Sequence, residues 1–136
     1  MNRIFADTLF WGALIYPRDQ YHNRAAAFAR LRRDANLVTT EEILAEFLDG
    51  LAHRGPLLRQ LTARTVDAIL DNSEVTVHRQ THESFLAALE LYRHRPDKGY
   101  SLVDCVSMNT MRRWAITEIL TNDRHFTQEG FRILRG

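Results

Sequence analysis

The chain has 136 residues, 45% of them hydrophobic and 26% charged, and its formal net charge is +1. This length favours one compact domain, and this composition predicts a folded core and excludes a disordered or low-complexity chain. Among the 18 lysine and arginine residues only Lys98 is lysine. Arginine binds phosphates well through its planar fork, but a genome-wide preference for arginine explains the same bias.

Several common classes of protein are excluded by simple features. The single cysteine, Cys105, rules out an internal disulfide and is typical of a reducing compartment. The N-terminal stretch MNRIFADTLFW lacks the apolar core of a signal peptide, and charges interrupt every apolar stretch before it could span a membrane. We therefore expect a soluble, cytoplasmic protein with no membrane partner.

In chain order, predicted strands alternate with predicted helices. Short apolar runs predict strands at residues 4–6, 36–40, 75–80, 117–123 and 131–134. Helical periodicity and breaker residues predict helices at residues 20–33, 39–55, 56–71, 82–94 and 101–114, a turn at 95–100, and a short helix or turn at 123–130. The alternation predicts an α/β fold with a mostly parallel sheet, in which ligands bind beyond the carboxyl ends of the strands.

Two acids directly follow predicted strands. Asp7 ends the first strand and Asp123 ends the fourth. Both are therefore expected at the edge of the sheet where active sites form. A turn or N-cap carboxylate is an equally good interpretation of either residue alone.

Glu46 and Glu42 are expected on different faces of the same predicted helix. Thr39 and Glu42 match a capping box, and at about 100° per residue Glu42 points nearly opposite the apolar centre of its helix. Glu42 is thus expected to be solvated or to serve the cap. Glu46 lies at the border of the apolar face, where a carboxylate either looks into a cleft or remains a surface acid.

Asp104 is the only charge in the apolar stretch SLVDCVSMNTM, residues 101–111. Ser101 and Asp104 fit a capping box, which is one explanation. A buried carboxylate otherwise needs hydrogen bonds, a partner or a metal ion, and the dipole at a helix N-terminus supplies part of that need.

The four acids together indicate more than each does alone. A set of hard oxygen ligands suits Mg²⁺ or Mn²⁺, and such ions support phosphodiester hydrolysis by polarising the phosphoryl oxygen and activating water. The six histidines do not form a zinc motif, because no HExxH occurs and a predicted strand-to-helix break separates His78 from His82.

Four segments carry a resemblance to a known family. ADTLFW, TTEEILAEFL, YSLVDCVSMNTM and LTNDRHF, in this order and spacing, resemble the PIN domain and more narrowly the VapC-type toxins of bacterial toxin–antitoxin pairs. The resemblance runs from Ile4 to about Leu134. It implies a single PIN domain over residues 1–136, folded as a three-layer α/β/α sandwich around a sheet of about five strands.

The resemblance also implies roles for individual residues. The acids that bind one or two Mg²⁺ or Mn²⁺ ions and support RNA cleavage by metal-activated water correspond to Asp7, Glu46, Asp104 and Asp123. Supporting residues are Thr8, which follows the first acid, Ser101 of the Ser-Leu-x-Asp motif, and Asn122. Members of the family differ in which residue after the fourth strand faces the metal, so Asn122 is an alternative to Asp123. Otherwise Asn122 and Thr121 assist through water. The implied partners are an RNA substrate, a cognate antitoxin whose peptide enters the cleft, and a second copy of the chain.

Substrate and partner contacts are predicted at other positions. Candidate phosphate contacts are Arg112, Arg113, Arg124 and His125. A solvated last helical turn is the alternative for the first two, and packing with Phe126 is the alternative for His125. Residues 51–71 are expected to serve dimerisation or antitoxin binding. Core packing or a partner surface is expected for Phe10, Trp11, Phe47 and Leu48.

Three other functions compete with a ribonuclease. A catalytically idle PIN-like module would use its acidic cleft for a basic partner peptide. A phosphoacceptor receiver domain needs an acid at the end of the third strand, which VTVHRQ lacks. A haloacid-dehalogenase-type phosphatase needs a second acid two residues after Asp7, where Leu9 stands.

Overall fold

Five parallel strands form one sheet in the computed structural model, which describes residues 2–31 and 35–134. The strands are β1 (Arg3–Ala6), β2 (Asn36–Thr40), β3 (Val75–His78), β4 (Glu118–Leu120) and β5 (Arg132–Leu134). Their order is β3-β2-β1-β4-β5, and every neighbouring pair is parallel. The predicted α/β fold is confirmed, and the sheet in the described ranges is wholly parallel.

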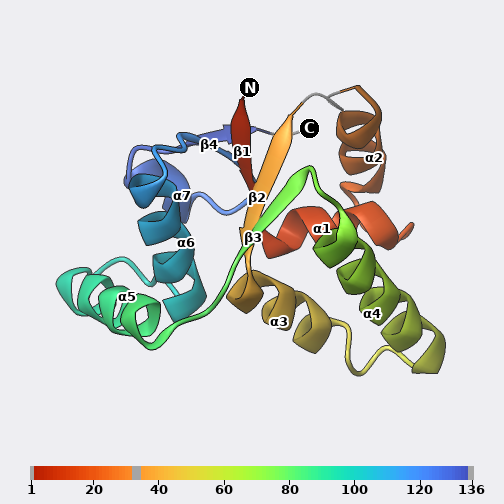
Figure 1. Ribbon diagram of the computed structural model, residues 1–136, viewed down its shortest axis with the longest axis horizontal. Coiled ribbons are helices and arrows are strands. Elements are labelled where there is room, and N and C mark those ends of the chain that lie inside the picture. Colours follow the sequence, from red (N-terminus) through yellow and green to blue (C-terminus); the bar gives the residue numbers. More distant parts are fainter. Residues whose placement is uncertain (1, 32–34, 135–136) are drawn as a thin grey trace.

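Helices cover both faces of this sheet. They are α1 (Thr8–Ile15), α2 (His22–Leu31), α3 (Glu41–Gly50), α4 (Pro56–Asp71), α5 (His82–His94), α6 (Leu102–Arg113) and α7 (His125–Gln128). Figure 1 shows α5, α6 and α7 on one side of the strands, α1, α2 and α4 on the other, and α3 below the end of β2. This is the expected three-layer arrangement.

Most helix bounds agree with the sequence, and the exceptions have local causes. The helices predicted at residues 56–71 and 82–94 match α4 and α5 to the residue. Helix α1 was not predicted, because TLFWGALI is apolar on every side and shows no periodicity. The helix predicted at residues 20–33 begins at His22, and residues 32–33 lie outside the described ranges.

The core lies where the two helical layers meet the sheet. The largest fully buried side chains include Phe5 of β1, Ile119 of β4, Phe47 of α3, Phe126 of α7, and Met108 and Met111 of α6. Phe10 and Trp11 of α1 are also buried, whereas Leu48 is half-buried. The core interpretation of Phe10, Trp11 and Phe47 is therefore confirmed.

The predicted capping box at the start of α3 is wrong, because the N-cap lies one residue later and Ile43 stands at the position that would need a polar side chain. Thr40 is the N-cap, and its Oγ1 accepts a hydrogen bond from the Ile43 amide at 3.1 Å. Thr39 still belongs to β2, and its hydroxyl donates to the Ala6 carbonyl at 3.0 Å. Glu42 is half-buried instead of solvated, its Oε1 has no hydrogen-bond partner among the described residues, and burial raises its pKa.

Candidate metal centre

The predicted acids lie where several elements end at one edge of the sheet. Asp7 links β1 to α1, and Asp123 follows β4. Strands β1 and β4 are parallel neighbours, and the Asp7 amide donates to the Leu120 carbonyl at 3.2 Å. The carboxyl ends of these two strands therefore bring residue 7 next to residues 121–123 despite their separation in sequence.

Asp7 is the most buried of the four acids, with 6% of its surface exposed. Its Oδ2 accepts a hydrogen bond from the Thr121 hydroxyl at 2.8 Å. The pKa of Asp7 is raised to about 6, mainly by burial, and the negative charges of Asp104 and Glu46 contribute to the rise. These three carboxylates thus share one region of negative potential that a cation would relieve.

Glu46 is held by a residue next to Asp7. The Thr8 hydroxyl, in the first turn of α1, donates a short hydrogen bond to Glu46 Oε1 across the α1–α3 contact. Glu46 is half-buried, as expected for a residue at the border of the apolar face of α3. Thr8 therefore orients the Glu46 carboxylate.

Asp104 is fixed by the start of α6. The predicted capping box is present, since the Asp104 amide donates to Ser101 Oγ at 3.0 Å and the Ser101 amide donates to Asp104 Oδ2 at 3.1 Å. The side chain keeps 14% exposure. The sequence left a helix cap and a metal-facing role as alternatives for Asp104. Its carboxylate serves the cap and also lies beside the His125 ring.

Asp123 and His125 complete a compact group with Asp104. Each of the three can offer one ligand atom, and these atoms lie within 4.8 Å of one another. His125 Nδ1 is 3.2 Å from Asp123 Oδ1 and 3.4 Å from Asp104 Oδ2. The His125 amide also donates to Asp123 Oδ1 at 2.9 Å, so the turn into α7 sets both side chains.

Thr121, and not Asn122, joins this group to Asp7. The Thr121 hydroxyl is buried, donates to Asp7 Oδ2, and accepts from the Asp123 amide at 3.1 Å. Asn122 lines a separate small apolar hollow between α1, α2 and β4 with residues such as Tyr21 and Arg24. The geometry therefore brings Asp123 to Asp104 and leaves Asn122 aside.

His125 is the member of this group that the sequence did not predict as a ligand. It was expected to contact phosphate or to pack with Phe126, and as metal ligands the histidines were considered only for zinc. The available signal was its position two residues after Asp123, where a tight turn can return the ring to the preceding carboxylate. Its ring also lies edge-on to Tyr100, with centroids 5.2 Å apart.

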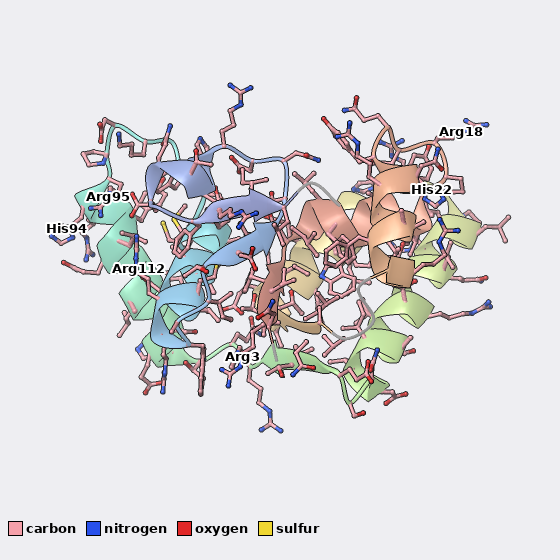
Figure 2. All side chains as sticks on the ribbon, turned by 90° about the horizontal axis from the view of Figure 1, so that it is seen from above. Arg3, Arg18, His22, His94, Arg95 and Arg112 are labelled. Carbon is pink, nitrogen blue, oxygen red and sulfur yellow. The ribbon has the colours of Figure 1, made fainter. Side chains whose placement is uncertain are left out.

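The candidate phosphate contacts have different surroundings. Arg112 pairs with Glu129, Nη2 to Oε1 at 2.6 Å, so its guanidinium is already engaged. Glu129 also binds Arg95 and the Tyr100 hydroxyl, and Figure 2 shows Arg95 and Arg112 on the same side of the molecule. Arg124 is exposed at the N-cap of α7, and the Arg113 guanidinium lies beside Trp114.

Comparison with known proteins identifies the class to which this fold and site belong. The PIN domain family matches residues 4–131, so the chain belongs to the PIN domain family. A solved structure with the same architecture is VapC20 of Mycobacterium tuberculosis, a toxin that cleaves the sarcin-ricin loop. It aligns with a TM-score of 0.83 and 26% identity over 94% of this chain and 95% of that chain. No curated protein matches the sequence significantly.

These comparisons confirm the resemblance drawn from the four sequence segments, both to the PIN domain and to VapC-type toxins. Among the described residues, no helix is both long and apolar enough to cross a membrane.

Proposed function

We propose that the protein is a VapC-type toxin that cleaves RNA as a divalent-metal-dependent endoribonuclease. The observation that carries the proposal is the convergence of Asp104, Asp123 and His125 at the sheet edge, with the buried Asp7 electrostatically coupled to Asp104 and Glu46. Membership of the PIN domain family and the similarity to a toxin that cleaves the sarcin-ricin loop support this chemistry.

The donor set fits a hard divalent cation. Carboxylate oxygens predominate and one imidazole is added. The pKa of Asp7 is raised mainly by burial and less by the charges of Asp104 and Glu46, and a bound cation would stabilise its ionised form. We propose Asp7, Glu46, Asp104 and Asp123 as the residues that hold Mg²⁺ or Mn²⁺, with His125 added to the set. Such an ion would polarise a phosphoryl oxygen and lower the pKa of a water molecule.

The surrounding residues hold these donors in place. Thr121 fixes Asp7, Thr8 fixes Glu46, and Ser101 fixes Asp104 through hydrogen bonds from elements that are packed in the core. Ligands placed on rigid elements lose little freedom when a metal binds, which favours an ordered site. Thr8, Ser101 and Thr121 are thus proposed as positioning residues.

The proposed partners follow from the toxin class. They are an RNA substrate, a cognate antitoxin that covers the acidic cleft, and a second copy of the chain, in the cytoplasm. The exposed side chains Leu57, Leu61 and Leu70 on α4 support the expectation that residues 51–71 include a partner surface.

Cleavage of labelled RNA tests the proposal. In the presence of Mg²⁺ or Mn²⁺, Asp7→Asn and Asp104→Asn should each lower the rate by about 100-fold or more, because each removes a charged ligand without changing shape. A chelator should abolish the activity of the parent chain. Asp67→Asn, on the exposed face of α4, is the matched control and should leave the rate unchanged.

Retained cleavage by both folded site variants would refute the proposed nuclease. The alternative of a catalytically idle binding module does not require metal binding, whereas the proposed nuclease does. Calorimetric titration with Mn²⁺ should give heat for the parent and for Asp67→Asn but none for Asp104→Asn. A parent chain that binds a basic peptide but neither Mn²⁺ nor RNA would establish the idle module instead.

A further inference from the structure

A second feature of the surface is a groove on the α5–α6 side of the sheet, which extends to the C-terminal end of α6. It runs between β3 and helices α5 and α6, and its lining includes Val77, His78, Val106, Asn109, Arg113 and Trp114. Figure 1 shows β3 in front of β1 and β2, with α5 and α6 to its left. Strand β3 ends the sheet order, so the groove is open along this edge.

Around Trp114, the groove is lined by aromatic rings and arginines. The rings of His78 and Trp114 stack with centroids 5.1 Å apart and planes 19° apart. The Arg113 guanidinium lies 5.8 Å from the centre of the Trp114 ring. Trp114 keeps 42% of its surface exposed, so the stack remains open to solvent.

Arginine charges gather around the stack without carboxylate partners. Burial lowers the pKa of His78, and the positive charges of Arg113 and Arg3 act in the same direction, so both guanidiniums lie near this ring. Arg79 also lines the groove. Within residues 2–31 and 35–134, none of these three arginines forms an ion pair, unlike Arg95 and Arg112.

The groove leads toward the acidic site along α6. It reaches Val106, two residues after Asp104, and Glu42, one helical turn before Glu46. From Asp104 to Trp114 the helix axis advances about 15 Å, since each residue adds about 1.5 Å. Stacked nucleotides rise about 3.4 Å each, so about four of them would span this distance.

We propose that the His78–Trp114 stack with Arg113 and Arg79 is a binding site for an unpaired nucleotide of the RNA, about four nucleotides from the cleaved bond. Unpaired bases are recognised by stacking on aromatic rings, and guanidiniums contact the flanking phosphates. Glu42 and Glu83 also line the groove, and their negative charges disfavour phosphate, so we assign the phosphate contacts to Arg113 and Arg79. The inference rests on the proposed ribonuclease activity.

Binding to an inactive chain tests this site separately from cleavage. In an Asp7→Asn background, the affinity for a labelled, unstructured oligoribonucleotide of about eight nucleotides is measured by fluorescence anisotropy. Trp114→Ala should weaken binding about tenfold, and Trp114→Phe should restore most of it. Tyr92→Ala is the matched control, because Tyr92 is a comparably exposed aromatic residue (51%) on α5 outside the groove.

Two further measurements separate stacking from a structural effect. RNA should quench the emission of exposed Trp114, since the other tryptophan, Trp11, is buried. Arg113→Ala should weaken binding and lower the salt dependence, the slope of log affinity against log salt falling by about 0.7 per lost phosphate contact. Thermal unfolding shows whether each variant is folded.

The outcomes distinguish this inference from the proposed function. If folded Trp114→Ala binds RNA as tightly as its parent while Asp7→Asn abolishes cleavage, the stacking site is refuted and the nuclease stands. If an arginine-rich peptide quenches Trp114 and RNA does not, the groove belongs to a protein partner and the proposal is overturned. If the parent chain neither binds nor cleaves RNA, both the stacking site and the proposed nuclease are refuted.

Discussion

At the scale of single residues, Asp7 shows how the site carries an electrostatic cost. The carboxylate is 6% exposed, and one hydroxyl, from Thr121, donates to it. Burial disfavours the ionised form and like charges nearby add to this effect, so its pKa rises from 3.8 to about 6. The charge that suits a metal ligand thus destabilises the metal-free fold.

This cost predicts that Asp7→Asn stabilises the metal-free protein near neutral pH. The folded pKa of Asp7 exceeds the unfolded value, so the folded chain holds the proton more tightly, and stability falls as the pH rises from about 4 to about 6. The substitution should raise the free energy of unfolding by up to about 3 kcal/mol at neutral pH and by little near pH 4. Urea denaturation in a chelating buffer measures both.

Asp67→Asn is again the control and should leave stability unchanged within about 0.5 kcal/mol. A fall in stability at neutral pH for Asp7→Asn would mean that the carboxylate is satisfied without a cation. That result would weaken the case for metal binding at this position.

At the scale of elements, Glu129 joins three segments around His125. It follows α7, its side chain is 5% exposed, and it accepts from Arg95 after α5, from Arg112 at the end of α6, and from the Tyr100 hydroxyl. The pKa of Glu129 is lowered to about 2, and the hydrogen bond from Arg95 is the largest cause. Tyr100 in turn contacts the His125 ring, so this cluster supports one side of the candidate site.

Glu129→Gln should therefore destabilise the protein at neutral pH by about 2 kcal/mol. The change removes a buried charge between two arginines, and their partial exposure reduces the loss relative to a fully buried pair. Because the folded pKa of Glu129 is depressed, its contribution is present above about pH 4.5 and disappears as the pH falls toward about 2.

Urea denaturation between acid and neutral pH checks this expectation. Glu90→Gln is the control, since the ion pairs of Glu90 with Arg93 and His94 are exposed, and it should change stability by less than about 0.5 kcal/mol. Equal effects of the two substitutions would show that the Glu129 cluster is not a structural link.

At the scale of the whole molecule, the strand order determines which residues meet at the edge of the sheet that carries the candidate site. Strands β1 and β4 lie next to each other and run in parallel, so the acids that follow them emerge together, while α3 and α6 bring Glu46 and Asp104 from either side. Parallel sheets with helices on both faces regularly place their sites at this edge. A bound ion would therefore link segments from the whole length of the chain.

Metal binding should consequently stabilise the entire fold. At a Mn²⁺ concentration about 100 times the dissociation constant, the free energy of unfolding should rise by about 2.7 kcal/mol, because the ion binds only the folded chain. Thermal unfolding with and without Mn²⁺ measures the shift. Asp67→Asn should keep the full shift and Asp104→Asn should lose most of it, whereas equal shifts in both would locate the ion elsewhere.

The sequence by itself determined the features that depend on neighbouring residues. Apolar runs and helical periodicity fixed most elements, and the Ser101–Asp104 capping box was predicted correctly because its partners are three residues apart. Acids directly after predicted strands could be assigned to one edge, since a parallel sheet aligns its strand ends. Local patterns did not predict α1, because its residues are uniformly apolar and show no helical period. They also gave the wrong N-cap for α3, because either of two adjacent threonines could serve as the cap.

Only the tertiary structure decided which distant side chains meet. His125 reaches Asp104 across 21 residues, and Thr121 reaches Asp7 across 114, so no local pattern encodes either contact. The Glu129 cluster and the His78–Trp114 stack likewise join elements that are far apart in sequence. Periodicity reports which side of an element is buried, whereas the packing of elements against one another determines which polar groups share a site.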